Sequence, residues 1–242
     1  LWFIRNWKAR NLLILATFLI LIGSLQNFAL KSSLEIAKDA AEGMKISISK
    51  GEEVSEETAA WAQAWIDYEN GYQTERDNIP NEIKNKTSSY ASAYEYNLEK
   101  ANETIYFLIP FFLFLDALMM MVVGMALFKL GILDGGREIG LYIKMMCIGF
   151  LIGLSINAYE VLLITNSNMG IIETNGYLRF TYHFGRLFIA LGYLGLIIVL
   201  IKLRKFSALK FRLACVGRMA LTNYLMHSVI ALFIFSGAGL GL

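Results

Sequence analysis

The sequence is poor in the residues on which disulfide-rich, metal-binding and nucleic-acid-binding proteins depend. Its 242 residues include two cysteines, two histidines and two prolines, and only 17% are charged. The cysteines lack metal-ligand or CxxC spacing, so they predict neither a zinc site nor a redox pair. A net charge of +2 is too small to favour nucleic-acid binding. No phosphate loop or nucleophile elbow is found, and we expect no bound metal or cofactor.

Apolar residues dominate instead, and they lie in long blocks. Hydrophobic residues make up 56% of the chain, and the mean hydropathy is +0.50. Because about 20 apolar residues cross the hydrocarbon core of a bilayer, these blocks predict an all-α, polytopic transmembrane helix bundle of about five spans. The predicted spans are residues 11–30, 105–130, 140–165, 177–203 and 213–242.

Basic residues are distributed unevenly among the connections between these spans. Arg5, Lys8 and Arg10 precede the first span, and five bases without an acid lie from the end of the fourth span, at Lys202, to the start of the fifth. The connection between the third and fourth spans has only Glu173 before Arg179. Because cytoplasmic loops are enriched in Lys and Arg, the pattern predicts a cytoplasmic N-terminus for this chain.

One long polar stretch, residues 31–104, separates the first two spans. It contains fifteen acidic and eight basic residues, and its flanks place it on the outer side of the membrane. The chain is thus predicted to have three parts. Residues 1–30 form the cytoplasmic end and first transmembrane helix, residues 31–104 an extracytoplasmic helical segment, and residues 105–242 a four-helix transmembrane region.

Two aromatic stripes predict helices within the external segment. After a helix start at Ser55, four rings recur at i, i+4, i+7 and i+11, namely Trp61, Trp65, Tyr68 and Tyr72. A second stripe begins at Tyr90, after Pro80, and continues toward the second span. We expect the two helices to pack their aromatic faces together or to lie at the lipid headgroups; the alternative is a lid over an outward-facing cavity.

Polar side chains inside apolar spans are the candidate functional residues, because a charge in hydrocarbon costs at least about 2.5–3.5 kcal/mol. Arg179, His183 and Arg186 have the spacing of one helical face, and so have Asn223 and His227. Acids and bases at similar depth can pair across the bundle and so form a polar cavity in its outer half. The full candidate set is Asp116, Glu160, Arg179, His183, Arg186, Asn223 and His227.

Structural explanations remain open for the same residues. Arg179 could extend to the outer headgroups, and Asp116 with Arg186 could be an ion pair that only locks two helices together. Neutral histidines can hydrogen-bond between helices without any chemistry. Small residues that permit close helix packing occur in the fourth span, namely Gly185, Gly192 and Gly195.

The fifth span carries a long contiguous motif. It begins Cys215-Val-Gly-Arg-Met-Ala-Leu-Thr-Asn-Tyr-Leu-Met-His-Ser228 and ends Gly237-Ala-Gly-Leu-Gly-Leu242. This motif resembles the signature of the YeiB-like family, bacterial inner-membrane proteins of unknown function. The stretch from Gly124 to Leu133 and the triplet Leu191-Gly-Tyr193 fit the same family. The resemblance covers the second to fifth spans and implies a location in the bacterial inner (cytoplasmic) membrane.

The chain also departs from the family pattern in two ways. Family members begin with a helix that carries an Asp and an Arg-Gly, and they continue with further spans after the final glycine-rich stretch. This chain starts at Leu1 without that helix, so we expect it to be the middle-to-late part of a longer protein. His227 stands where the family usually has Gln, which favours hydrogen bonding over catalysis for this residue.

Three functions are compatible with these patterns, and the resemblance implies no catalytic residues. The family has been suggested to act in transport and is distantly grouped with membrane acyltransferases. The first hypothesis is transport or binding of a small anionic solute in an outward-facing cavity, with Asp116 or Glu160 as proton carrier. The residues that would bind the solute are Arg179, Arg186, Glu160, Asn223 and His227.

The second hypothesis is acyl transfer to an extracytoplasmic acceptor, with His183 as general base; His183 and Asp116 are the candidate catalytic residues. The third is a non-catalytic scaffold whose external helices bind a partner. The expected partners are the lipid bilayer, a small-molecule or acyl substrate and the remaining helices of the full-length protein. No nucleic acid is expected, and the oligomeric state is not predicted.

Overall fold

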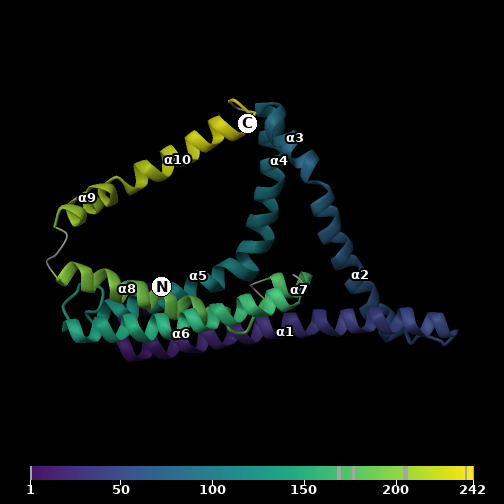
Figure 1. The fold of residues 1–242 in the computed structure, drawn as a ribbon, viewed down its shortest axis with the longest axis horizontal. Coiled ribbons are helices and arrows are strands. Elements are labelled where there is room, and N and C mark those ends of the chain that lie inside the picture. The colour runs from purple at the N-terminus through teal and green to yellow at the C-terminus, as the bar shows by residue number, and fades with distance from the viewer. Residues whose placement is uncertain (1, 168–169, 176–177, 204–206, 238, 242) are drawn as a thin grey trace. The chain divides into compact units, whose positions relative to one another are not determined.

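Helices make up the regular secondary structure of this protein. The computed structural model describes residues 2–167, 170–175, 178–203, 207–237 and 239–241. These residues contain no strand, which confirms the all-α prediction. The elements in chain order (Figure 1) are η1 Trp2–Ile4, α1 Ala9–Lys50, α2 Glu56–Asp77, α3 Ile79–Ser88, α4 Tyr90–Glu103, η2 Thr104–Leu113, α5 Phe114–Lys129, α6 Ile139–Asn166, α7 Ile171–Thr174, α8 Tyr182–Lys202, α9 Ser207–Arg218 and α10 Ala220–Phe235.

The helices form two compact units. The first unit consists of Leu1–Asn70 and Leu115–Leu203, and therefore contains α1, most of α2, and α5 to α8. The second unit consists of Gly71–Phe114 and Arg204–Leu242, with the end of α2, then α3, α4, η2, α9 and α10. Five of the seven candidate residues belong to the first unit.

The first helix is longer than the span predicted for it. α1 has 42 residues, so it measures about 63 Å, roughly twice the thickness of the hydrocarbon core. Its beginning contains the predicted span 11–30, and residues 31–50 continue the same helix. The helix ends at Gly51, whose φ of 74° is the left-handed conformation that commonly stops a helix.

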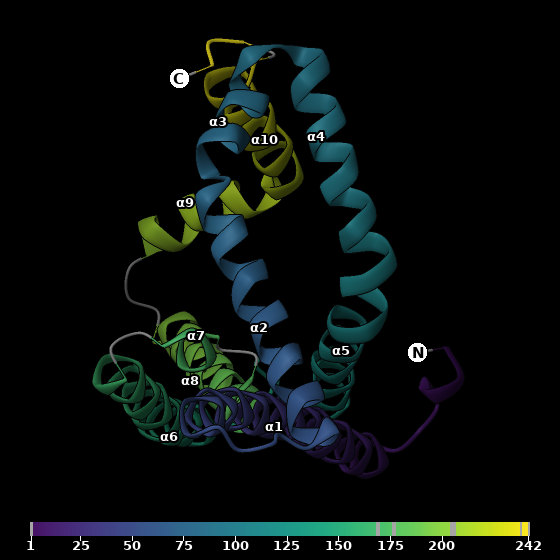
Figure 2. The same cartoon turned by 90° about the vertical axis from the view of Figure 1, so that its right-hand side faces the viewer.

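α6 and α8 pack closely against each other in the first unit, and Figure 2 shows both beside α1. A Cβ atom added at Gly149 would lie 2.6 Å from the backbone nitrogen of Gly192. One added at Gly195 would lie 2.6 Å from the carbonyl oxygen of Tyr142. The two backbones therefore approach at a distance that only glycine permits, which confirms the packing role predicted for Gly192 and Gly195.

The predicted start of α2 is present, but part of its aromatic face packs differently from the prediction. Ser55 Oγ accepts a hydrogen bond from the backbone N–H of Thr58 at 3.3 Å. Trp65 is buried, with Tyr68 beside it, against the small residues Ala37 and Ala41 of α1. The expectation that these two rings pack on a second aromatic helix was wrong, because the extension of α1 supplies the surface that covers them.

The second predicted span is helical throughout but changes helix type. Residues 104–113 form the π-helix η2, and α5 follows directly from Phe114. The backbone is therefore helical from Tyr90 to Lys129 without a break, as the second aromatic stripe predicted. Pro110 lies in η2, and its backbone nitrogen has no hydrogen to donate to the helix.

Fewer of the described helices have the length and hydropathy of a membrane span than the about five that the sequence predicts. Within the described residues, α1, α6 and α8 are long and apolar enough to cross a bilayer. The predicted fifth span is not one straight helix, because Lys210–Arg218 and Ala220–Phe235 meet at an angle of 68°; counted as one broken span, they raise the number to four. The chain is thus a membrane protein with three or four candidate spans.

The glycine-rich end of the family-like motif contacts the α3–α4 junction within the second unit. The backbone N–H of Gly237 donates a hydrogen bond of 2.7 Å to the carbonyl oxygen of Lys86. A Cβ atom at Gly237 would lie 2.6 Å from the backbone nitrogen of Ser89. Close backbone contact explains the need for glycine at this position.

Candidate functional site

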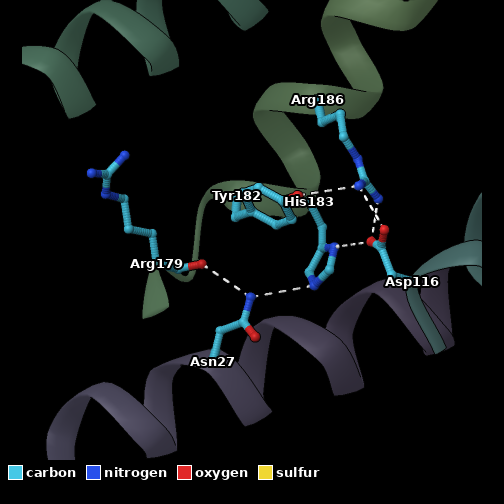
Figure 3. A network of polar contacts seen from close by, with 6 residues as sticks. All are labelled: Asn27, Asp116, Arg179, Tyr182, His183 and Arg186. Carbon is cyan, nitrogen blue, oxygen red and sulfur yellow. Dashed lines mark hydrogen bonds and ion pairs between the residues drawn. The ribbon is translucent and has the colours of Figure 1, made fainter. Parts of the chain in front are cut away.

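A network of polar side chains occupies the interior of the first unit, and its centre is an ion pair between α5 and α8 (Figure 3). The guanidinium of Arg186 binds the carboxylate of Asp116 through both of its terminal nitrogens. Nη1 lies 2.7 Å from Oδ2, and Nη2 bonds to Oδ1. This bidentate geometry is the strongest arrangement of an arginine with a carboxylate. This pairing was one of the alternatives that the sequence left open, and the structure contains it.

Tyr182 supports the arginine from the preceding turn of α8. Arg186 Nη1 donates a hydrogen bond of 3.3 Å to the tyrosine hydroxyl. The guanidinium carbon also lies 5.0 Å from the centroid of the tyrosine ring, within range of a cation–π interaction. The side chain of Arg186 is nevertheless 34% exposed and that of Asp116 is 21% exposed, so the described protein covers the pair only partly.

His183 is the buried member of the network, with 6% of its side chain exposed. Its Nδ1 atom lies 3.4 Å from Asp116 Oδ1, a contact longer than a well-formed hydrogen bond. Its Nε2 atom lies 3.3 Å from the side-chain nitrogen of Asn27 on α1. Asp116 is therefore in contact with both a permanent cation and an imidazole.

Three residues of α1 complete this region, and sequence analysis did not single them out. Asn27 is buried beside His183, and Ser24 is fully buried one turn earlier. A Cβ atom at Gly23 would lie 2.9 Å from His183 Nε2 and 2.5 Å from the Met119 methyl group, so glycine makes room for both side chains. The sequence feature that could have identified them is the i, i+4 spacing of Gly23 and Asn27 near the end of an apolar span, which places both on one face of the helix.

A second ion pair lies between α6 and the segment that precedes α8. Arg179 Nη1 is 3.1 Å from Glu160 Oε2, and Arg179 Nη2 donates to the carbonyl oxygen of Glu173 at 2.6 Å. The Thr181 hydroxyl donates to Glu160 Oε1 at 2.5 Å. The side chains of Glu160 and Arg179 are 11% and 15% exposed. The carbonyl oxygen of Arg179 accepts a 3.4 Å hydrogen bond from Asn27 and thereby links the two ion pairs.

The prediction that Arg179 shares a helical face with His183 and Arg186 was wrong. α8 begins at Tyr182, so Arg179 precedes the helix and does not follow its periodicity. Figure 3 shows its side chain directed away from His183 while its carbonyl oxygen faces Asn27. The hydropathy of residues 177–203 could not locate this helix start, because the preceding turn is also largely apolar.

Asn223 and His227 belong to α10 in the second unit, where both are exposed. They are one helical turn apart, and their role in binding stays a prediction.

The second unit also has a polar cavity of about 710 Å³ bordered by the end of α2, α3 and α4. Its lining includes Tyr72, Tyr96 and Glu82. The hydrogen bond from Lys86 lowers the pKa of the Glu82 carboxyl.

The four charges of this network form two pairs. Arg186 is paired with Asp116 and Arg179 with Glu160, and such pairing offsets much of the cost of placing these groups among apolar helices. An anion would therefore have to replace a carboxylate in order to bind either arginine. In the described part of the chain, no group of three or more His, Cys, Asp and Glu side chains could hold a metal ion.

Fold and network together define an all-α membrane protein with paired charges among its apolar helices. Residues 127–242 match the model of one family, whose description is "Protein of unknown function (DUF418)". This is the YeiB-like family, so the resemblance seen in the sequence is confirmed over residues 127–242. The match includes α6, α8 and α10 but neither Asn27 nor Asp116. No curated protein and no solved structure matches the chain.

Proposed function

We propose that the first unit binds a small anionic solute at Arg186 and carries it across the membrane. The observation that supports the proposal is the position of Asp116, which is shared by Arg186 and His183 inside an apolar bundle. A purely structural ion pair needs two partners, whereas this carboxylate has a third group beside it. The partial exposure of Arg186 also leaves a side from which a solute can approach.

Binding would proceed by exchange of one anion for another. The oxyanion of the solute replaces the Asp116 carboxylate on the two terminal nitrogens of Arg186. Asp116 then lacks its cation in a low-dielectric environment, and it takes up one proton from the solution on the open side. The site gains one negative charge from the solute and one positive charge from the proton, so its net charge does not change. One solute anion and one proton would thus move together.

The Glu160–Arg179 pair has a different role in this proposal. Both side chains are more deeply buried than Arg186 and hold the turn before α8 through the carbonyl of Glu173 and the hydroxyl of Thr181. We assign this pair to positioning the start of α8 on the outer side of the membrane. The proposal retains a cytoplasmic N-terminus and an inner-membrane location for the chain.

A second candidate function is acyl transfer, and one observation favours it. A carboxylate beside Nδ1 of a histidine orients the ring so that Nε2 can act as a general base. Asp116 and His183 have this relation at 3.4 Å. In the described structure, however, Nε2 contacts Asn27 and the ring is buried, so an acceptor could reach it only after α1 has moved.

The test of the proposed function is an untargeted metabolite and lipid comparison of a deletion strain with its parent. The strain is complemented with the unaltered protein, with Arg186→Gln, or with the matched control Glu35→Gln. Glu35 also pairs with a cation on a helix, since it lies 3.2 Å from Lys31, but that pair is exposed. We expect a small anion to change its level in the deletion strain and to be restored by the control but not by Arg186→Gln.

Two other outcomes would contradict the proposal. Restoration of the anion level by Arg186→Gln, at a normal amount of protein in the membrane, would exclude Arg186 as the binding group. The acyltransferase alternative predicts a different result. The deletion strain would lose an acyl modification of a surface molecule, and Arg186→Gln but not His183→Ala would restore it.

A further inference from the structure

We infer that Asn27 is a positioning residue that holds His183 as the neutral tautomer with its hydrogen on Nδ1. The residue lies outside the part of the chain that matches the family model. The tautomer itself follows from the contacts of the two side chains. Only its role in solute binding rests on the proposed function.

The orientation of the Asn27 amide is set by the backbone. The side-chain nitrogen of Asn27 lies 3.4 Å from the carbonyl oxygen of Arg179. A carbonyl oxygen can only accept hydrogen bonds, so the amide NH2 must face it, while the amide oxygen would be repelled. The same nitrogen lies 3.3 Å from His183 Nε2.

The orientation of the amide then determines the state of the imidazole. An amide NH2 group only donates, so Nε2 of His183 must accept and carries no hydrogen. A neutral imidazole has one hydrogen, which is therefore on Nδ1. Nδ1 faces Asp116 Oδ1, which is an acceptor. Both ring nitrogens thus face groups that fit one tautomer, whereas an imidazolium would direct its Nε2–H against the hydrogens of the amide.

Burial makes this arrangement difficult to change. The Asn27 and His183 residues are 7% and 5% exposed. The absent side chain of Gly23 is what allows His183 Nε2 to lie against α1. The Asn27 amide covers Nε2, so a proton could reach Nε2 only if the amide turned away. That movement would break the hydrogen bond to Arg179, whose side chain binds Glu160.

This tautomer has a consequence for the proposed exchange of anions. A neutral His183 adds no second positive charge beside Asp116, so Arg186 remains the single cation paired with that carboxylate. Asp116 is therefore less strongly held than it would be between two cations, and a solute can displace it more readily.

The test is nitrogen-15 solid-state NMR of the histidine-labelled chain in lipid bilayers. The chain has two histidines, so a His227→Gln background leaves the signals of His183 alone. We expect a protonated Nδ1 and an unprotonated Nε2. A hydrogen on Nε2, whether alone or together with one on Nδ1, would overturn the assignment.

Three variants in the same background separate positioning from packing. Asn27→Asp replaces the donor with an acceptor, so we expect the hydrogen to appear on Nε2. Asn27→Leu keeps a side chain of similar size without a donor, so we expect a mixture of tautomers. Asn11→Asp changes an exposed amide at the start of the same helix, α1, and should leave the signals unchanged. Unaltered signals in both Asn27 variants would contradict the inference.

The two proposals fail in different ways. The NMR signals are recorded without any solute, so they test the tautomer even if the metabolite comparison reveals no anion. Conversely, loss of anion handling in Arg186→Gln together with a hydrogen on Nε2 in the unaltered chain would retain the proposed function and reject the role of Asn27.

Discussion

At the scale of single residues, Asp116 has more contacts than a helix-locking ion pair requires. It binds Arg186 through both carboxylate oxygens and lies beside His183 Nδ1. The helices that supply these groups are otherwise apolar, so each charge depends on its partner. Removal of one partner is therefore more damaging than removal of both.

The first prediction concerns the energy of this pair. We expect Asp116→Leu alone to lower the free energy of unfolding by roughly 2–3 kcal/mol, a value reduced from that of a fully buried pair because both side chains are partly exposed. The double variant Asp116→Leu with Arg186→Met should lose about 1 kcal/mol or less, since it leaves no unpaired charge. Unfolding of the chain in lipid bilayers measures both values, and equal losses would contradict the account.

Part of the site was predictable from single residues. A charge within an apolar span requires a partner, so Asp116, Glu160 and Arg186 could be recognised in the sequence as members of ion pairs. Asn27 carries no charge and lies in a span with many apolar neighbours, so hydropathy gave no reason to single it out. Its importance depends on the carbonyl of Arg179, which is 152 residues away.

At the scale of helices, the contact between α6 and α8 depends on glycine. We predict that Gly149→Ala lowers the free energy of unfolding by about 1–3 kcal/mol, because the new methyl group would meet the Gly192 backbone and force the helices apart. Gly140→Ala is the matched control, because a Cβ atom there has no neighbour within 4 Å. If both variants unfold at the same denaturant concentration, close packing of the two backbones is not what stabilises this pair.

The contact of α2 with α1 provides a second prediction at this scale. Trp65 is 7% exposed, whereas Trp61 on the same helix is 38% exposed. We expect Trp65→Ala to cost about 3–5 kcal/mol, since it removes a large side chain from the cluster with Ala37, Ala41 and Ile172. Trp61→Ala should cost less than half as much. A larger loss for Trp61 in the same unfolding measurement would mean that the aromatic face packs elsewhere.

Hydropathy predicted some helices better than others for a physical reason. It located the apolar cores of α1, α6 and α8, because the requirement for about 20 apolar residues is local. Hydropathy depends on residue type and not on the direction of the helix axis, so it missed the 68° bend next to Ala220 in the predicted fifth span. It also ended α1 at residue 30, where apolarity falls, although helix propensity continues to Lys50.

At the scale of the whole molecule, the orientation in the membrane remains a prediction from the distribution of basic residues. With the five spans predicted from the sequence, including residues 105–130, we expect residues 31–104 outside and the connection before α9 in the cytoplasm. In a background without Cys147 and Cys215, a membrane-impermeant thiol reagent applied to intact cells should label Ser88→Cys but not Ser207→Cys. Labelling of Ser207→Cys alone would reverse the orientation, and after lysis both variants should react.

Fold class and function differ in how far the sequence could predict them. The all-α membrane fold follows from composition and block length, which many residues specify together. The proposed function depends on a few side chains from α1, α5 and α8 that meet through long-range contacts. The sequence therefore supplied most members of the site but not the arrangement that links Asn27, His183 and Asp116.

The most direct test of the central claim uses the double variant Asp116→Leu with Arg186→Met in the deletion strain. Because it contains no unpaired charge, this variant should reach the membrane in normal amount. If Arg186 binds the solute, the variant will be present in the membrane and yet will fail to restore the anion level of the parent. Full restoration by this variant would show that the ion pair only holds the helices together.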